Sequence, residues 1–96
     1  MTPESGLKRQ IKAYLNSIGA YHNMVPGGAY GKNGSPDIIV CYRGKFIAIE
    51  GKIAKGQQSG WQKLRQNQIE RAGGIYIIAR DVSDVSDIIS SLEKEE

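Results

Sequence analysis

The stretch GSPDIIVCYRGKFIAIEGK, residues 34–52, contains two apolar runs separated by a short polar break. The runs, at about residues 37–42 and 45–52, are rich in Ile, Val and aromatic residues, which favours two β-strands. Arg43 and Gly44 between them predict a two-residue hairpin turn. Because apolar residues occur on both faces of each run, we expect the hairpin to lie at the centre of a sheet, buried on both sides. This hairpin therefore decides the fold.

Three charged residues lie where the predicted hairpin opens. With a two-residue turn Tyr42 faces Lys45, and the same register places Asp37 opposite Glu50. Directly opposed side chains have Cβ atoms roughly 4.5 to 5.5 Å apart. Lys52 projects from the same face as Glu50, because side chains alternate along a strand. We therefore expect two carboxylates and one ammonium group to meet at one end of the sheet.

Two opposed carboxylates predict a cation between them. Like charges directly opposite one another destabilise a sheet unless something neutralises them. Mg²⁺ and Mn²⁺ prefer oxygen ligands and bind through one or two carboxylates together with water or phosphate oxygens. Lys52 beside such an ion would lower the pKa of an attacking water or stabilise charge in a transition state. The alternative is that Lys52 forms an ordinary ion pair with Asp37 or Glu50.

The rest of the chain predicts helices and strands on both sides of the hairpin. Apolar residues recur with helical spacing near residues 3–18, 61–72 and 84–93, whereas residues 20–25 and 75–79 have the composition of strands. The pattern predicts an α/β fold, a small mixed sheet flanked by helices in the order αβββαβα. The second helix also carries three apolar residues that we expect in the core or, as an alternative, in a dimer seam: Trp61, Leu64 and Ile69.

Composition narrows the class of protein and of partner. A chain of 96 residues is sized for one domain. Residues 81–96 hold six acidic side chains against one basic, whereas residues 1–80 hold twelve basic against four acidic. The basic body indicates a polyanion such as nucleic acid as partner, with a solvated basic surface as the alternative. The single Cys41 excludes an internal disulfide, and no apolar run reaches the roughly 18 residues that span a membrane, so we expect a cytoplasmic protein, in the host cytoplasm if viral.

The charged hairpin resembles the PD-(D/E)XK nuclease superfamily, in which an Asp and a Glu-x-Lys face each other across a hairpin. Here Pro36-Asp37 supplies the Pro-Asp pair. More closely, nearly the whole chain, from Glu4 to about Ala79, resembles the VRR-NUC domain, the virus-type replication-repair nuclease. The resemblance is carried by four matched motifs in order: Glu4 on the first helix, Gly34 to Asp37, Glu50 to Lys52, and Gln62 on the next helix.

The resemblance implies one nuclease domain over residues 1–96 with a restriction-endonuclease-like αβββαβ core. It implies a structure-selective DNA endonuclease that depends on Mg²⁺ or Mn²⁺ and hydrolyses phosphodiester bonds. Stand-alone members resemble Holliday-junction resolvases, so a four-way DNA junction and a second copy in a homodimer are the expected partners. The alternative is a catalytically weak DNA-binding module that retains the nuclease fold, because Gly51 stands where the family has an apolar β-branched residue.

The resemblance also implies a role for each matched residue of the hairpin. Asp37 and Glu50 would ligate the metal together with the main-chain carbonyl of Gly51. Lys52 would act on the attacking water. The glycine packs nothing and would loosen its strand by roughly 0.5 to 1 kcal/mol, although its carbonyl can still bind a metal.

Residues outside the hairpin are expected to complete the site and to hold the DNA. The resemblance places Glu4 and Gln62 beside the catalytic group, whereas the alternatives are an ordinary first-turn Glu and a solvated Gln, with Gln66 or Gln68 as a substitute. Contacts to the DNA backbone are expected from basic residues, and base stacking from one tyrosine: Lys8, Arg9, Lys12, Lys32, Lys55 and Lys63, with Tyr30.

Overall fold

The computed structural model describes residues 4–25, 34–52 and 57–94, with side chains from Gly6 onward. The elements of the described residues follow the predicted order αβββαβα, and each predicted helix and strand is present. Their bounds are α1 (Glu4–Ser17), β1 (Tyr21–Met24), β2 (Ile38–Tyr42), β3 (Lys45–Gly51), α2 (Gly60–Arg71), β4 (Ile75–Ala79) and α3 (Val82–Glu93). No helix in these three ranges is long and apolar enough to cross a membrane.

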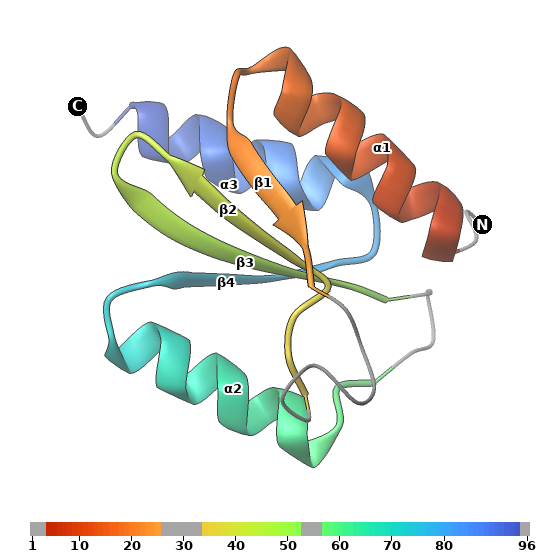
Figure 1. Ribbon diagram of the computed structural model, residues 1–96, viewed down its shortest axis with the longest axis vertical. Helices are drawn as coiled ribbons and strands as arrows, with labels where there is room; N and C mark the ends of the chain where they lie inside the picture. Colours follow the sequence, from red (N-terminus) through yellow and green to blue (C-terminus); the bar gives the residue numbers. More distant parts are fainter. Residues whose placement is uncertain (1–3, 26–33, 53–56, 95–96) are drawn as a thin grey trace.

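The four strands form one mixed sheet in the order β1-β2-β3-β4. β1 pairs with β2 and β2 with β3 in antiparallel fashion, whereas β3 and β4 are parallel and are connected through α2. Figure 1 shows α1 and α3 together on one face of the sheet and α2 on the other. The predicted α/β fold with a small mixed sheet between helices is therefore confirmed.

The hydrophobic core lies between the sheet and the α1–α3 layer. Apolar residues of α1 recur at spacings of four, so that one stripe of the helix faces the sheet. α3 contributes a second stripe, and alternate residues of the strands complete the core. The fully buried large side chains are Leu7, Ile11, Leu15, Ile38, Val40, Ile47, Ile49, Ile77, Val85 and Ile89.

The opposite face of the sheet is only partly covered. α2 packs against β4 and has no buried residue, so that Trp61 is 52% exposed and Leu64 42%. The prediction that these two residues belong to the core is therefore wrong. Phe46 of β3 is 46% exposed, and Cys41 of β2 is exposed as well. The second face of the hairpin is consequently open near the turn, whereas Ala48 farther along β3 is buried on it, because a single helix at the β4 edge cannot cover four strands. The expectation that the hairpin is buried on both sides is therefore wrong for the half that includes the turn.

The register of the β2–β3 hairpin agrees with the predicted one. Tyr42 pairs with Lys45, and the ladder continues without a bulge to the pair of Ile38 and Ile49. Arg43 has φ 51° and Gly44 has φ 79°, and positive values at both central residues are those of a type I′ turn. This turn matches the right-handed twist of the strands, so that it fixes which residues face each other at the far end.

Candidate active site

The two carboxylates meet at the open end of the hairpin, as predicted. Asp37 directly precedes β2, and continuing the ladder beyond Ile38 places it opposite Glu50. The main-chain carbonyl of Asp37 accepts a hydrogen bond from the amide of Val25 at 2.9 Å. Its side-chain Oδ2 accepts another from the amide of Gly51 at 2.8 Å. Asp37 is thus fixed from both neighbouring segments.

Glu50 is a buried carboxyl group with an unsatisfied oxygen. It is 3% exposed, and its Oε1 has no hydrogen-bond partner among the described residues. The pKa of Glu50 is raised to about 8, first by burial and then by the charge of Asp37 and a hydrogen bond with that carboxyl, while the charges of Lys52 and Lys8 act in the opposite direction. The raised pKa favours a proton on Glu50, and such a proton removes the repulsion between the two carboxyl groups.

This donor set fits a small, hard divalent cation. A buried carboxyl oxygen without a partner costs free energy unless a proton or a cation satisfies it. Among the described residues no three His, Cys, Asp or Glu side chains come together, so the site offers the pair Asp37 and Glu50. Mg²⁺ commonly binds through one or two carboxylates and keeps several waters, so two are enough. The carbonyl of Gly51 as a third ligand stays a prediction.

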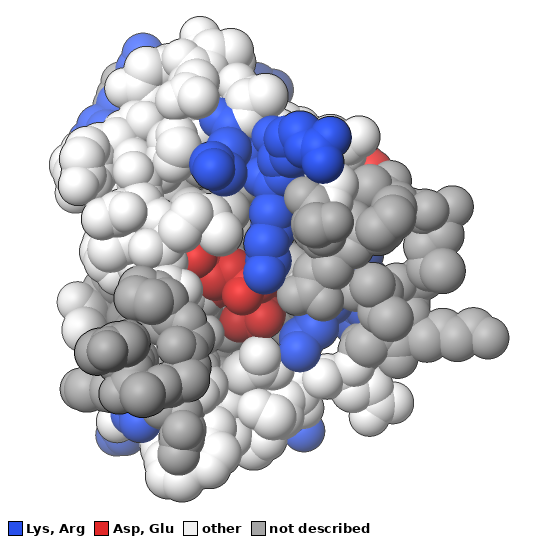
Figure 2. Space-filling view, turned by 45° about the vertical axis from the view of Figure 1, so that its right-hand side comes forward, with Lys and Arg blue, Asp and Glu red and all other residues white. Residues whose placement is uncertain are grey.

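The lysines are arranged differently from the sequence-based expectation. Lys52 follows β3, and its amide donates a hydrogen bond to the carbonyl of Ala79 at 2.9 Å. Its side chain forms no ion pair with any described carboxylate. Lys8, expected as a DNA contact, instead places its Nζ 3.3 Å from Asp37 Oδ1. Figure 2, in which the right-hand side of Figure 1 comes forward, shows acidic side chains set back in a hollow among basic ones.

Gln62 and its substitutes are engaged elsewhere in the described structure. Gln62 Oε1 accepts a hydrogen bond from the main-chain amide of Ser59 at 2.9 Å, and the main-chain amide of Gln62 donates one to Ser59 Oγ at 3.1 Å. Together they form a capping box at the start of α2. Gln66 bonds to Gln58 and Gln68 to Arg65. No hydrogen bond joins any of these three glutamines to Asp37 or Glu50. The structure therefore does not support the predicted contact of Gln62 with the catalytic group.

The remaining predicted residues fall into two groups. Arg9 and Lys12 on α1 and Lys63 on α2 are exposed, as a contact to DNA requires. Three of the other predicted residues lie outside the described residues: Tyr30, Lys32 and Lys55. Glu4 belongs to α1, but its side chain is not described.

Tyr76 is a member of this site that the sequence analysis did not identify. It pairs with Ala48, and strand alternation puts it on the same face as Glu50. Its hydroxyl is buried and Gln58 approaches it without forming a hydrogen bond of ordinary geometry. Burial raises the pKa of Tyr76, and the charges of Glu50 and Asp37 add to the rise. The signal in the sequence is a single tyrosine in an otherwise aliphatic strand. It indicates a polar site nearby, because a buried hydroxyl normally needs a hydrogen-bond partner.

Gly34 allows the chain before Asp37 to lie directly against α2. This contact was not predicted from the sequence. It has φ +78°, and a Cβ atom there would lie 2.3 Å from the carbonyl carbon of Trp61 and 2.6 Å from the amide nitrogen of Gln62. The chain before Asp37 therefore lies directly against the first turn of α2. Only glycine permits so close a contact between two main chains.

Gly34→Ala should destabilise the protein by about 3 kcal/mol, because the new methyl group overlaps the main chain of α2 and also strains the left-handed conformation. Gly19→Ala is the matched control: its φ is +73° and nothing lies within 4 Å, so only the conformational strain of about 1 kcal/mol applies. Urea unfolding measures both. Equal losses in the two variants would contradict the close contact.

A solved structure described as "VRR_NUC domain" has the same architecture. It is 18% identical in sequence, and the match covers 94% of this chain and 97% of that one with a TM-score of 0.77. This chain has the VRR-NUC fold. No protein-family model matches the sequence, and no curated protein matches it significantly. The predicted resemblance to VRR-NUC domains is thus confirmed in the fold, and this VRR-NUC fold carries glycine at the centre of its Glu-x-Lys motif.

The glycine at that centre leaves room for a side chain. A Cβ atom at Gly51 would lie 3.6 Å from Asp37 Oδ2, 3.7 Å from Leu7 Cδ2 and 3.8 Å from Lys8 Cγ, all ordinary contact distances. Gly51→Ala should therefore raise the free energy of unfolding by about 0.5 to 1 kcal/mol, since alanine restricts the unfolded chain without strain in this VRR-NUC fold. Urea unfolding tests this. A loss of stability would show that the end of β3 must stay bare.

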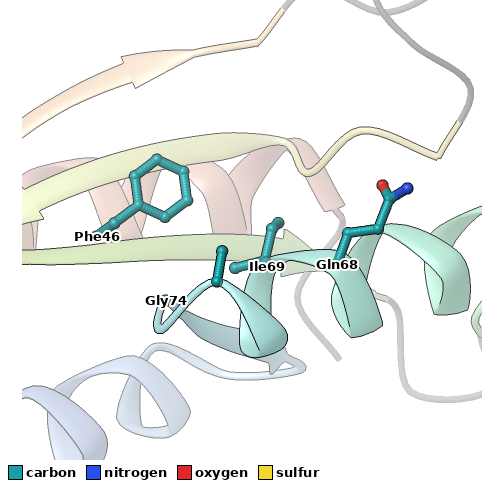
Figure 3. Close-up of a pocket in the computed structure, with 5 residues that line it drawn as sticks. Phe46, Gln68, Ile69 and Gly74 are labelled. Carbon is teal, nitrogen blue, oxygen red and sulfur yellow. The ribbon is translucent and has the colours of Figure 1, made fainter.

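The uncovered face of the sheet forms an apolar surface distinct from the carboxylate site. A depression of about 270 Å³ lies between Phe46 and the end of α2, and a second of about 150 Å³ lies between Phe46 and β1. Figure 3 shows Phe46 on the sheet side of the first, with Gln68, Ile69 and Gly74 on the side of α2. We call this the Phe46 surface, which is made of Tyr21, Ile39, Cys41, Phe46 and Ile69.

Proposed function

We propose that this protein is a metal-dependent DNA endonuclease that hydrolyses phosphodiester bonds. The observation that carries the proposal is the buried Glu50 beside Asp37: one oxygen of Glu50 is satisfied by no described group, and Asp37 is paired with Lys8. A charged cluster at such a place is destabilising for the fold, and perturbed carboxyl groups of this kind are typical of functional sites. The VRR-NUC fold of the chain supports the same class of reaction.

Asp37 and Glu50 would hold Mg²⁺ or Mn²⁺, with the Gly51 carbonyl as a further ligand. When bound, such an ion supplies Lewis acidity and lowers the pKa of an attacking water. Glu50 would bind the ion as a carboxylate, after loss of its proton. Lys52, without an ion pair in the described residues, is available to stabilise the negative charge that develops on the phosphate oxygens. The products would be a 5′-phosphate and a 3′-hydroxyl.

Binding to DNA would rest on the phosphate backbone. Arg9, Lys12 and Lys63 are exposed basic side chains, and Lys32 and Lys55 are assigned the same role from the sequence, with Tyr30 stacking on a base. Contacts of this kind fix the orientation of the duplex without reading its sequence. Affinity should therefore fall steeply as the salt concentration rises.

A four-way junction is the proposed substrate, and a homodimer the proposed assembly. Two strands of a junction must be cut at symmetric positions, which requires two sites related by a two-fold axis. The Phe46 surface would form the seam, because both depressions are apolar and meet at one exposed aromatic ring. Light scattering should give about twice the 10.5 kDa chain mass, and Phe46→Asp should give the monomer. A mass of about 10.5 kDa for the parent protein would exclude the homodimer.

The function is tested by incubating the protein with a labelled four-way junction in Mn²⁺, Mg²⁺ or EDTA, with a linear duplex of the same sequence beside it. The proposal expects cleavage of the junction in Mn²⁺ or Mg²⁺ and none in EDTA. Preference for the junction over the duplex would support structure selectivity. Binding without cleavage in either metal would favour the alternative, a DNA-binding module with a weakened site, for which Gly51 in the Glu-x-Lys motif is the specific observation.

A further inference from the structure

Lys8 reaches the carboxylate site from helix α1. Its Nζ lies 3.3 Å from Asp37 Oδ1, and its side chain is 27% exposed. Its stem passes the end of β3, since a Cβ atom at Gly51 would lie 3.8 Å from Lys8 Cγ. The aliphatic part is thus held against the strand and directs the ammonium group toward the carboxylate.

Both oxygens of Asp37 are engaged in the described structure. Oδ2 accepts from the amide of Gly51 at 2.8 Å, and Oδ1 pairs with Lys8. A divalent cation held by Asp37 and Glu50 has to share this carboxylate. A dication bound to the same carboxylate would repel the ammonium group of Lys8 in this partly buried site. The cation and Lys8 therefore compete for Asp37.

Lys52 is placed differently. Its charge lowers the pKa of Glu50, but it forms no ion pair with a described carboxylate, so a cation at the site breaks no ion pair of Lys52. Before a cation binds, Lys8 is therefore paired with Asp37, whereas Lys52 has no ion pair among the described residues.

We propose that Lys8 is an exchangeable counter-ion, which holds Asp37 in the metal-free protein and is released by a divalent cation to bind a DNA phosphate beside the site. The inference rests on the proposed nuclease function. Lys8 then acts first as a positioning residue, keeping Asp37 directed toward Glu50, and then as a contact to substrate. An ammonium freed from a carboxylate is suited to a phosphate oxygen, since both pairs are charge-assisted hydrogen bonds.

The first test measures Mn²⁺ binding by electron paramagnetic resonance in the absence of DNA. Lys8→Met keeps the aliphatic stem and removes the charge, so Mn²⁺ should bind about tenfold more tightly. Lys45→Met, at the exposed hairpin tip, removes an equal charge from the same sheet and should leave the Mn²⁺ affinity unchanged. Unchanged or weaker Mn²⁺ binding in Lys8→Met would overturn the proposal.

The second test measures junction binding with Ca²⁺, a hard cation that also takes oxygen ligands, and with EDTA. In Ca²⁺, Lys8→Met should bind the junction about tenfold more weakly than the parent protein. In EDTA the two proteins should bind almost equally, because Lys8 is then held by Asp37. Equal losses in Ca²⁺ and EDTA would make Lys8 a permanent phosphate contact and overturn the exchange.

A third measurement needs no substitution and applies even where Lys8→Met fails to fold. Acetylation of Lys8 by an amine-reactive ester, followed by mass spectrometry, should be faster with Ca²⁺ than with EDTA and slow again when junction DNA is added. Reactivity independent of Ca²⁺ would overturn the proposal. A parent protein that neither binds Mn²⁺ nor cleaves DNA would instead overturn the proposed function, which separates the two failures.

Discussion

Glu50→Gln is expected to abolish DNA cleavage in Mn²⁺ and Mg²⁺ and to leave junction binding intact or tighter. The amide removes a metal ligand but keeps the shape of a side chain that is 3% exposed, so the fold should not change. Asp37→Asn should have the same effect on cleavage. Single-turnover cleavage of a labelled junction measures the rate, and a gel shift measures binding. Full activity in either variant would contradict the assignment of metal ligands.

Glu50→Gln should abolish cleavage, but in EDTA it is expected to increase the stability of the protein at high pH. The pKa of Glu50 rises from 4.5 to about 8 on folding, so the folded state binds the proton more tightly than the unfolded state does. The contribution of Glu50 to stability is therefore complete below pH 4.5 and is lost as the pH rises through about 8. Because glutamine does not titrate, Glu50→Gln should be more stable than the parent protein at pH 9.

Urea unfolding at pH 5 and pH 9 with EDTA measures this difference. Glu70→Gln serves as the control, since Glu70 is an exposed acid on α2 and the free energy of unfolding of that variant should follow the parent. Mn²⁺ at pH 9 should raise the free energy of unfolding of the parent protein and leave that of Glu50→Gln unchanged, because only the carboxylate binds the ion. A parent whose stability does not fall between pH 5 and pH 9 would contradict the raised pKa.

Lys52→Ala is expected to lower the rate of cleavage by a factor of about 10² while the junction is bound in Ca²⁺ with nearly the parent affinity. The ammonium group stabilises charge that exists only in the transition state, so its loss affects the rate more than binding. Lys45→Ala at the hairpin tip is the control for loss of one positive charge. A loss confined to binding would make Lys52 a phosphate contact and not a catalytic group.

The hairpin and its charged end could be predicted because the information is local. Arg43-Gly44 specifies the turn, the turn specifies the register, and the register brings Asp37 to Glu50. Nothing in this reasoning depends on a distant part of the chain.

The contacts that could not be predicted join segments far apart in the sequence. The ion pair of Lys8 with Asp37 depends on how α1 lies against the sheet, and the contact of Gly34 with α2 depends on where that helix begins. Trp61 lies outside the core, although apolar residues at helical spacing usually face one. Whether a helix finds such a partner is decided by the width of the sheet that it covers, which no local pattern encodes.

The connectivity of the site also bears on the order of events in folding. Asp37 and Glu50 belong to one hairpin, whereas β4 joins β3 only after the chain has crossed over through α2. A hairpin forms in roughly 1 to 10 μs, and parallel pairing through a long connection is slower. The two carboxyl groups should accordingly approach each other before the second half of the sheet exists. Alkaline pH would then slow the folding step itself, because the nascent hairpin has to bring two negative charges together.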